Sequence, residues 1–64
     1  MSFRQLQLEV WQRRVIEQRA EVAAIEEKLR TASGEDVFDL RDELKKARRV
    51  LQWAEEEIQR LSRF

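Results

Sequence analysis

Apolar residues recur along the chain at alternating intervals of three and four, in two separate runs. The first run comprises Leu8, Trp11, Val15, Val22, Ile25, Leu29 and Ala32, with the polar Gln18 at the same spacing; the second comprises Val37, Leu40, Leu44, Ala47, Leu51, Ala54, Ile58 and Leu61. This spacing places each run on one stripe of an α-helix, and about four heptads of it are typical of a coiled coil. The pattern therefore predicts an all-α chain with two long amphipathic helices.

The two runs differ in phase by one residue. Counting seven positions on from Leu29 gives Asp36, whereas the second run begins at Val37. The shift coincides with the segment TASGED, residues 31–36, which holds the only glycine of the chain. The chain is therefore expected to turn back here, so that the two helices pack as an antiparallel coiled-coil hairpin.

The residues of the turn predict how the helices end and begin. Gly34 is suited to the positive φ that ends a helix, and Ser33 with Asp36 has the spacing of a capping box for the second helix. We predict a single domain over residues 1–64, with helices over about 3–32 and 36–63 and a turn over about 33–36.

Charged residues beside the stripes test the antiparallel pairing. A turn at Gly34 brings oppositely charged residues together in four pairs: Lys28 with Glu43, Arg14 with Glu57, Glu26 with Arg48, and Arg19 with Glu55. The same pairing forms between two chains if the turn straightens, so a domain-swapped dimer stays an alternative to the closed hairpin. Gln18 either makes a polar contact across the core that fixes the register or extends to the edge of the core.

The composition removes most catalytic and metal chemistry. The chain has no Cys, which excludes disulfides and thiolate metal sites, and no His, the commonest metal ligand and general base. Neighbouring carboxylates such as Glu26 and Glu27 diverge on a helix, and a single glycine cannot form a Gly-rich phosphate loop. We therefore expect a non-enzymatic protein with no cofactor, no metal and no small-molecule substrate.

A second set of apolar residues lies off the core stripes and gathers on one flank of the predicted hairpin. This set comprises Phe3, Leu6, Val10, Val50, Trp53 and Phe64. Exposed apolar surface of this kind marks interfaces, and domains below roughly 70–80 residues usually need oligomerisation or another support. We therefore expect dimerisation through this flank into a four-helix bundle, or docking of a helix from another protein. The alternative is that Trp53 covers its own neighbours within one chain.

These features predict a small protein–protein interaction module, such as an adaptor, an assembly factor or a co-chaperone. The alternative is a nucleic-acid-binding regulator that uses the basic residues of KKARR, namely Lys45, Lys46, Arg48 and Arg49. The predicted hairpin is similar in length and architecture to the Rop family of plasmid regulators, which bind RNA through helix faces. The 13 basic and 13 acidic residues sum to zero net charge, which disfavours this alternative. No signal peptide or membrane span is recognisable, so we expect a cytoplasmic location and no membrane partner.

Two short segments resemble a known helical hairpin. IEEKLR at residues 25–30 and DLRDELKKAR at residues 39–48 are similar to the UVR hairpin of nucleotide-excision-repair proteins, which mediates protein–protein contact. In size and shape the predicted hairpin is also similar to small co-chaperones of type III secretion. Both resemblances imply a hairpin with a binding role, and neither carries a diagnostic motif that assigns the chain to a family.

Overall fold

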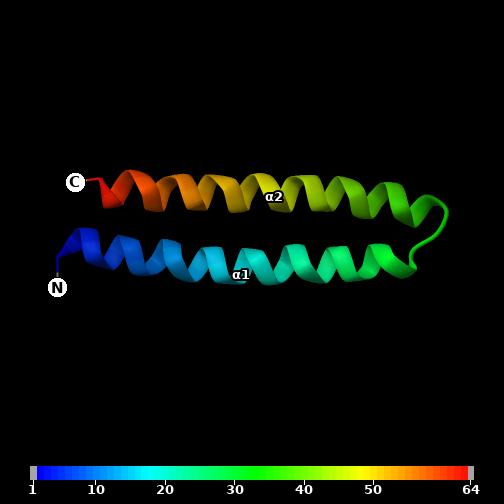
Figure 1. Cartoon of the computed structure of the whole chain (residues 1–64), viewed down its shortest axis with the longest axis horizontal. Coiled ribbons are helices and arrows are strands. Elements are labelled where there is room, and N and C mark those ends of the chain that lie inside the picture. The colour runs from blue at the N-terminus through cyan, green and yellow to red at the C-terminus, as the bar shows by residue number, and fades with distance from the viewer. Residues whose placement is uncertain (1, 64) are drawn as a thin grey trace.

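The computed structural model describes residues 2–63, which form two helices joined by a short turn. α1 spans Phe3–Thr31 and α2 spans Glu35–Ser62. They run antiparallel side by side in a rod of 49 × 15 × 12 Å, with both chain ends at the same end of the rod (Figure 1). No strand occurs within the described residues, so the predicted all-α hairpin is confirmed. The helix ends lie within one residue of their predicted positions.

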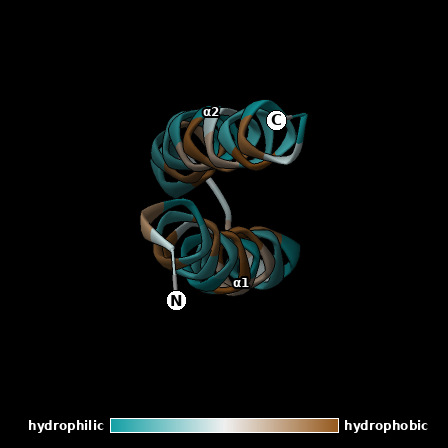
Figure 2. Cartoon of the chain, turned by 90° about the vertical axis from the view of Figure 1, so that its left-hand side faces the viewer, coloured by the Kyte–Doolittle hydropathy of each residue, from teal (hydrophilic) through white to brown (hydrophobic). Residues whose placement is uncertain are grey.

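The core is a single seam between the helices. Five of the described residues are buried, and all belong to the two predicted stripes: Val15, Val22, Ile25, Ala47 and Ala54. Half-buried leucines from both helices pack against the cluster of Val22, Ile25 and Ala47. Seen from the end of the rod, the two helix axes cross rather than run strictly parallel, as packed amphipathic helices do (Figure 2). A hairpin with this seam leaves most of each helix surface exposed.

A capping box that the sequence reading missed begins α1. The Ser2 hydroxyl accepts a hydrogen bond from the Gln5 backbone N–H at 3.2 Å, and the Ser2 N–H donates to Gln5 Oε1 at 3.1 Å. The Ser-x-x-Gln spacing is the signal that identifies this motif. Close by, Arg4 Nε donates to the Leu61 carbonyl of α2 at 2.8 Å, which ties the open ends of the hairpin together.

The turn differs from its prediction in detail. Gly34 does adopt a positive φ of 64°, but it does not end the first helix, because Ala32 is already extended with ψ 152°. Gly34 instead stands at the N-cap of α2, and its carbonyl accepts a hydrogen bond from the Val37 N–H at 3.3 Å. The capping box expected from Ser33 and Asp36 was therefore wrong, since no side chain caps α2.

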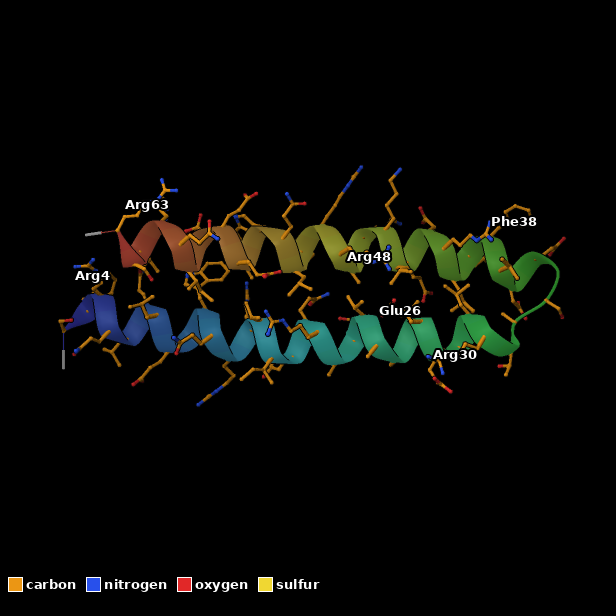
Figure 3. All side chains as sticks on the ribbon, viewed as in Figure 1. Arg4, Glu26, Arg30, Phe38, Arg48 and Arg63 are labelled. Atoms are coloured by element: carbon orange, nitrogen blue, oxygen red, sulfur yellow. The ribbon has the colours of Figure 1, made fainter. Side chains whose placement is uncertain are left out.

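Two of the four predicted charge pairs form, and they confirm the register of the two helices. Arg48 contacts Glu26 at 3.2 Å, as predicted (Figure 3). Arg19 contacts Glu55 at 3.5 Å, also as predicted. The other two predicted pairs do not form: Arg14 lies over the Trp11 ring, Glu57 pairs with Arg60, and Lys28 and Glu43 make no ion pair within residues 2–63. Half-buried Gln18 donates from Nε2 to the Ala47 carbonyl of α2 at 3.2 Å, so it makes the polar contact across the core.

Candidate interaction surfaces

The predicted interface residues lie on the surface of both helices. Phe3, Leu6 and Val10 are 75%, 48% and 60% exposed on α1, and Val50 and Trp53 are 42% and 49% exposed on α2. Phe64, the sixth predicted residue, lies outside the described residues. The hairpin register therefore leaves five large apolar side chains accessible rather than covering them within the chain.

Trp53 also contacts its own chain, through a partner that the sequence reading did not identify. Its ring packs edge-to-face against Trp11, with the centroids 4.9 Å apart and the planes at 84°. The Arg14 guanidinium lies 5.4 Å from the centroid of the Trp11 ring, at a distance typical of a cation–π contact. Trp53 thus contacts α1 through Trp11 while half of its surface stays exposed.

Two grooves join four of the predicted interface residues, and Trp53 is connected to them by its contact with Trp11. One runs along α1 and is lined by Phe3, Leu6, Gln7, Val10, Trp11 and Arg14. The other lies between the helices and is lined by Trp11, Arg14, Glu17, Gln18, Val50 and Ala54. Because Trp11 and Arg14 belong to both, the grooves adjoin. We call this surface the apolar flank and define it by Phe3, Leu6, Val10, Trp11, Val50 and Trp53.

Two other large apolar residues among residues 2–63 are exposed and lie away from the apolar flank. Ile16 is 68% exposed and Phe38 is 72% exposed. Phe38 does not cap the turn, because its ring stands clear of both helices near the turn (Figure 3). A hydrophobic staple also needs an apolar partner before the N-cap, and that position is Ser33.

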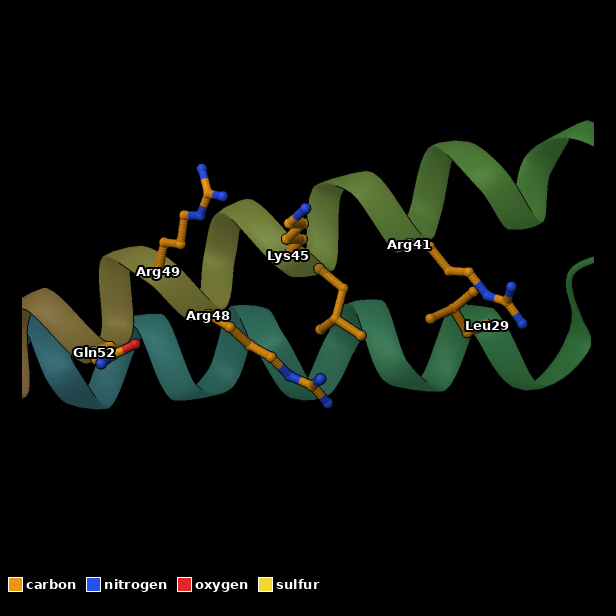
Figure 4. A pocket seen from close by; sticks show the side chains of 7 residues that line it. Leu29, Arg41, Lys45, Arg48, Arg49 and Gln52 are labelled. Carbon is orange, nitrogen blue, oxygen red and sulfur yellow. The ribbon is translucent and has the colours of Figure 1, made fainter.

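The four predicted nucleic-acid residues divide into two groups. Lys46 pairs with Asp42 at 3.0 Å and Arg48 pairs with Glu26 at 3.2 Å, so their charges are partly neutralised. Lys45 and Arg49 form no ion pair within residues 2–63. Together with Arg41, which the sequence reading missed, they line a groove that also holds Leu29, Leu44, Arg48 and Gln52, and no carboxylate (Figure 4).

Two further properties concern other kinds of site. Among residues 2–63, no group of three or more His, Cys, Asp or Glu side chains is arranged to hold a metal ion. Neither of the two helices has an apolar stretch long enough to cross a membrane.

Comparison with known proteins found no match to a family model, a curated sequence or a solved structure. The likeness to UVR hairpins and the architectural analogy with Rop proteins therefore remain resemblances of short segments and of shape.

Proposed function

We propose that this chain is a small protein–protein interaction module that packs its apolar flank against helices, and that its first partner is a second copy of the same chain. The observation that carries the proposal is the continuity of exposed apolar side chains from both helices around the Trp11–Trp53 pair. Such a surface on a small chain is typical of an interface.

The exposed area is sufficient for a dimer. With roughly 150–250 Å² for a whole aromatic side chain, the exposed 75% of Phe3 and 49% of Trp53 offer about 200–300 Å². The exposed parts of Leu6, Val10 and Val50 bring the apolar area to on the order of 400 Å² per chain. Two flanks in contact would bury roughly 800 Å² of apolar surface, and about 1,400 Å² with a normal polar share, within the range of specific interfaces.

The small core gives the chain a reason to self-associate. A two-helix hairpin buries one stripe on each helix, and a second apolar surface needs a second layer of helices. Only five of residues 2–63 are buried, and domains of this length usually rely on an additional support. Packing two flanks together gives a four-helix arrangement in which the aromatic rings act as anchors and the charged rim sets orientation.

A helix from another protein fits the same surface by the same chemistry. It would present apolar residues at intervals of three and four to the groove along α1. An adaptor, assembly factor or co-chaperone acts in this way, and such a helix would compete with the second copy for the apolar flank.

Sedimentation equilibrium over a concentration series tests self-association. We expect the wild type to reach twice the chain mass, and Val10→Glu to remain at the chain mass, because a charge would be placed within the interface. Val10 is 60% exposed, so this change does not disturb the hairpin. Trp53→Glu is expected to act in the same way, with circular dichroism at 222 nm confirming that its helices persist.

Ile16→Glu is the matched control. It introduces the same charge at an apolar residue that is 68% exposed but lies off the apolar flank. We expect it to dimerise like the wild type. A monomeric wild type throughout the series would exclude the second copy as partner, and equal weakening by Ile16→Glu and Val10→Glu would exclude the flank as the interface.

A further inference from the structure

We propose that α2 also carries a binding site for single-stranded nucleic acid, in which Arg41, Lys45 and Arg49 contact the phosphate backbone and Phe38 stacks against a base. We call Arg41, Lys45 and Arg49 the cationic stripe. The site is separate from the apolar flank and does not depend on the function proposed for it.

The cationic stripe is the part of a basic segment that is left without acidic partners. Residues 41–49, RDELKKARR, contain five bases and two acids. Asp42 forms an ion pair with Lys46 at 3.0 Å. Glu43 lines a groove on the other side of the seam, together with Gln18 and Val50. The three residues of the stripe have no ion pair within residues 2–63, so their charges are available to an external anion.

The stripe has the geometry of a linear charge array. Its residues are spaced by four, so they follow one face of α2 and rise by about 6 Å at each step. Arg41 reaches over the groove toward Leu29, while Lys45 and Arg49 project away from α1 (Figure 4). The groove beside them is lined by leucine and basic side chains, and its nearest carboxylate, that of Glu26, is paired with Arg48 at 3.2 Å.

Phe38 supplies the second element of a single-strand site. It lies three residues before Arg41 and seven before Lys45, which places it on the same face of α2 as the stripe. Its ring is 72% exposed and points away from α1 (Figure 3). Proteins that bind single strands combine a basic track for the backbone with aromatic rings on which unpaired bases stack. Bases in a duplex are already stacked, so the ring favours a single strand.

The salt dependence of binding measures the phosphate contacts. We would follow fluorescence anisotropy of fluorescein-labelled oligo(dT) and oligo(U) of 12 nucleotides with the full chain. Three contacts predict a slope of about −2 in log affinity against log salt, so affinity should fall roughly twenty-fold between 50 and 200 mM salt. The two oligonucleotides should bind alike, since neither the stripe nor the ring reads the sugar.

Two double variants separate the stripe from net charge. Arg41→Gln/Lys45→Gln should reduce the slope to about −0.7, so that affinity falls only about three-fold over the same salt range. Arg13→Gln/Lys28→Gln removes two exposed bases of α1 and changes the net charge equally, yet should keep the wild-type slope. Phe38→Ala should weaken binding about five-fold or more without changing the slope.

Several results would overturn the proposal. They are the absence of binding at 50 mM salt, equal loss of slope in the two double variants, and equally tight binding of a polyglutamate peptide in place of the oligonucleotide. Equally effective competition by a blunt-ended duplex would exclude the stacking role of Phe38 and the preference for single strands.

Discussion

Truncation of Ile25 tests whether the seam between the helices stabilises the hairpin as described. Ile25 is 6% exposed and packs with Val22 and Ala47. Ile25→Ala removes three carbon atoms from this cluster. At about 0.8 kcal/mol for each buried methylene-sized group, the lost transfer free energy is about 2.5 kcal/mol, before any cavity is counted.

The cavity contribution should be small at this position. Ile25 borders an open groove together with Gln18 and Val50, so neighbouring side chains and water can fill the space. We therefore expect a loss of about 3 kcal/mol in the free energy of unfolding. A chain of 64 residues has roughly 3–10 kcal/mol in total, so this single change removes a third of it or more.

Ile16→Ala provides the control for Ile25→Ala. It removes the same atoms from the same helix, but Ile16 is 68% exposed. Its loss should stay within about 0.5 kcal/mol. Urea unfolding followed by circular dichroism at 222 nm measures both, at one protein concentration, because association adds to apparent stability. In thermal unfolding, Ile25→Ala should lower Tm by roughly 12–24 °C.

The comparison between the two isoleucines decides the outcome. Equal losses for Ile25→Ala and Ile16→Ala would mean that the observed seam is not what holds the helices together. A loss below about 1 kcal/mol for Ile25→Ala would lead to the same conclusion, since it is less than the transfer free energy alone.

Four further changes are measured by the same urea unfolding. Gly34→Ala should cost about 1–2 kcal/mol, because alanine is strained at φ 64° and ψ −135°, although its Cβ meets no atom within 4 Å. Ser33→Ala removes no cap, so it should change stability by less than about 0.5 kcal/mol. Ser2→Ala should cost about 1 kcal/mol and speed amide exchange in the first turn of α1, and unchanged exchange there would refute the capping box. Arg48→Gln should cost no more than about 1 kcal/mol at low salt and nothing measurable in 1 M NaCl, because its pair with Glu26 is exposed.

The helices and their register could be predicted from the sequence because one physical signal repeats many times. Every turn of each helix contributes an apolar position, so a single polar residue such as Gln18 does not obscure the stripe. The predicted contacts of Glu26 with Arg48 and of Arg19 with Glu55 follow from the same register.

The capping of α2 could not be predicted, because it depends on a competition between neighbouring residues. Ser33 and Asp36 have the same spacing as Ser2 and Gln5, yet only the latter pair forms a capping box. A cap at Ser33 would place Gly34 inside the first turn of the helix, where glycine is unfavourable. The helix instead begins after Gly34, and the dihedral angles of Gly34 produce the change in chain direction.

The two candidate surfaces could be predicted only in part, because the sequence pattern does not fix the contacts of individual side chains. The heptad position of Trp53 predicts which side of α2 its side chain leaves, but not how far the ring extends toward α1. Its T-shaped contact with Trp11 was therefore missed. The contiguous motif KKARR suggested a site of four basic residues. The observed groove is instead lined by residues four apart on α2, and it therefore includes Arg41. The pairing of Lys46 with Asp42 was readable from the sequence, since oppositely charged residues four apart on a helix interact.

The apolar flank and the cationic stripe occupy different faces of α2 and adjoin only where Arg49 precedes Trp53 by one helical turn. A second copy docked on Val50 and Trp53 therefore leaves Arg41 and Lys45 accessible, and only Arg49 can enter the rim of that interface. A symmetric dimer would carry two such stripes, so a strand long enough to reach both would bind more tightly than a short one without any new contact. The two proposed activities are thus physically compatible, and Arg41 and Lys45 are the positions at which the stripe can be altered without touching the apolar flank.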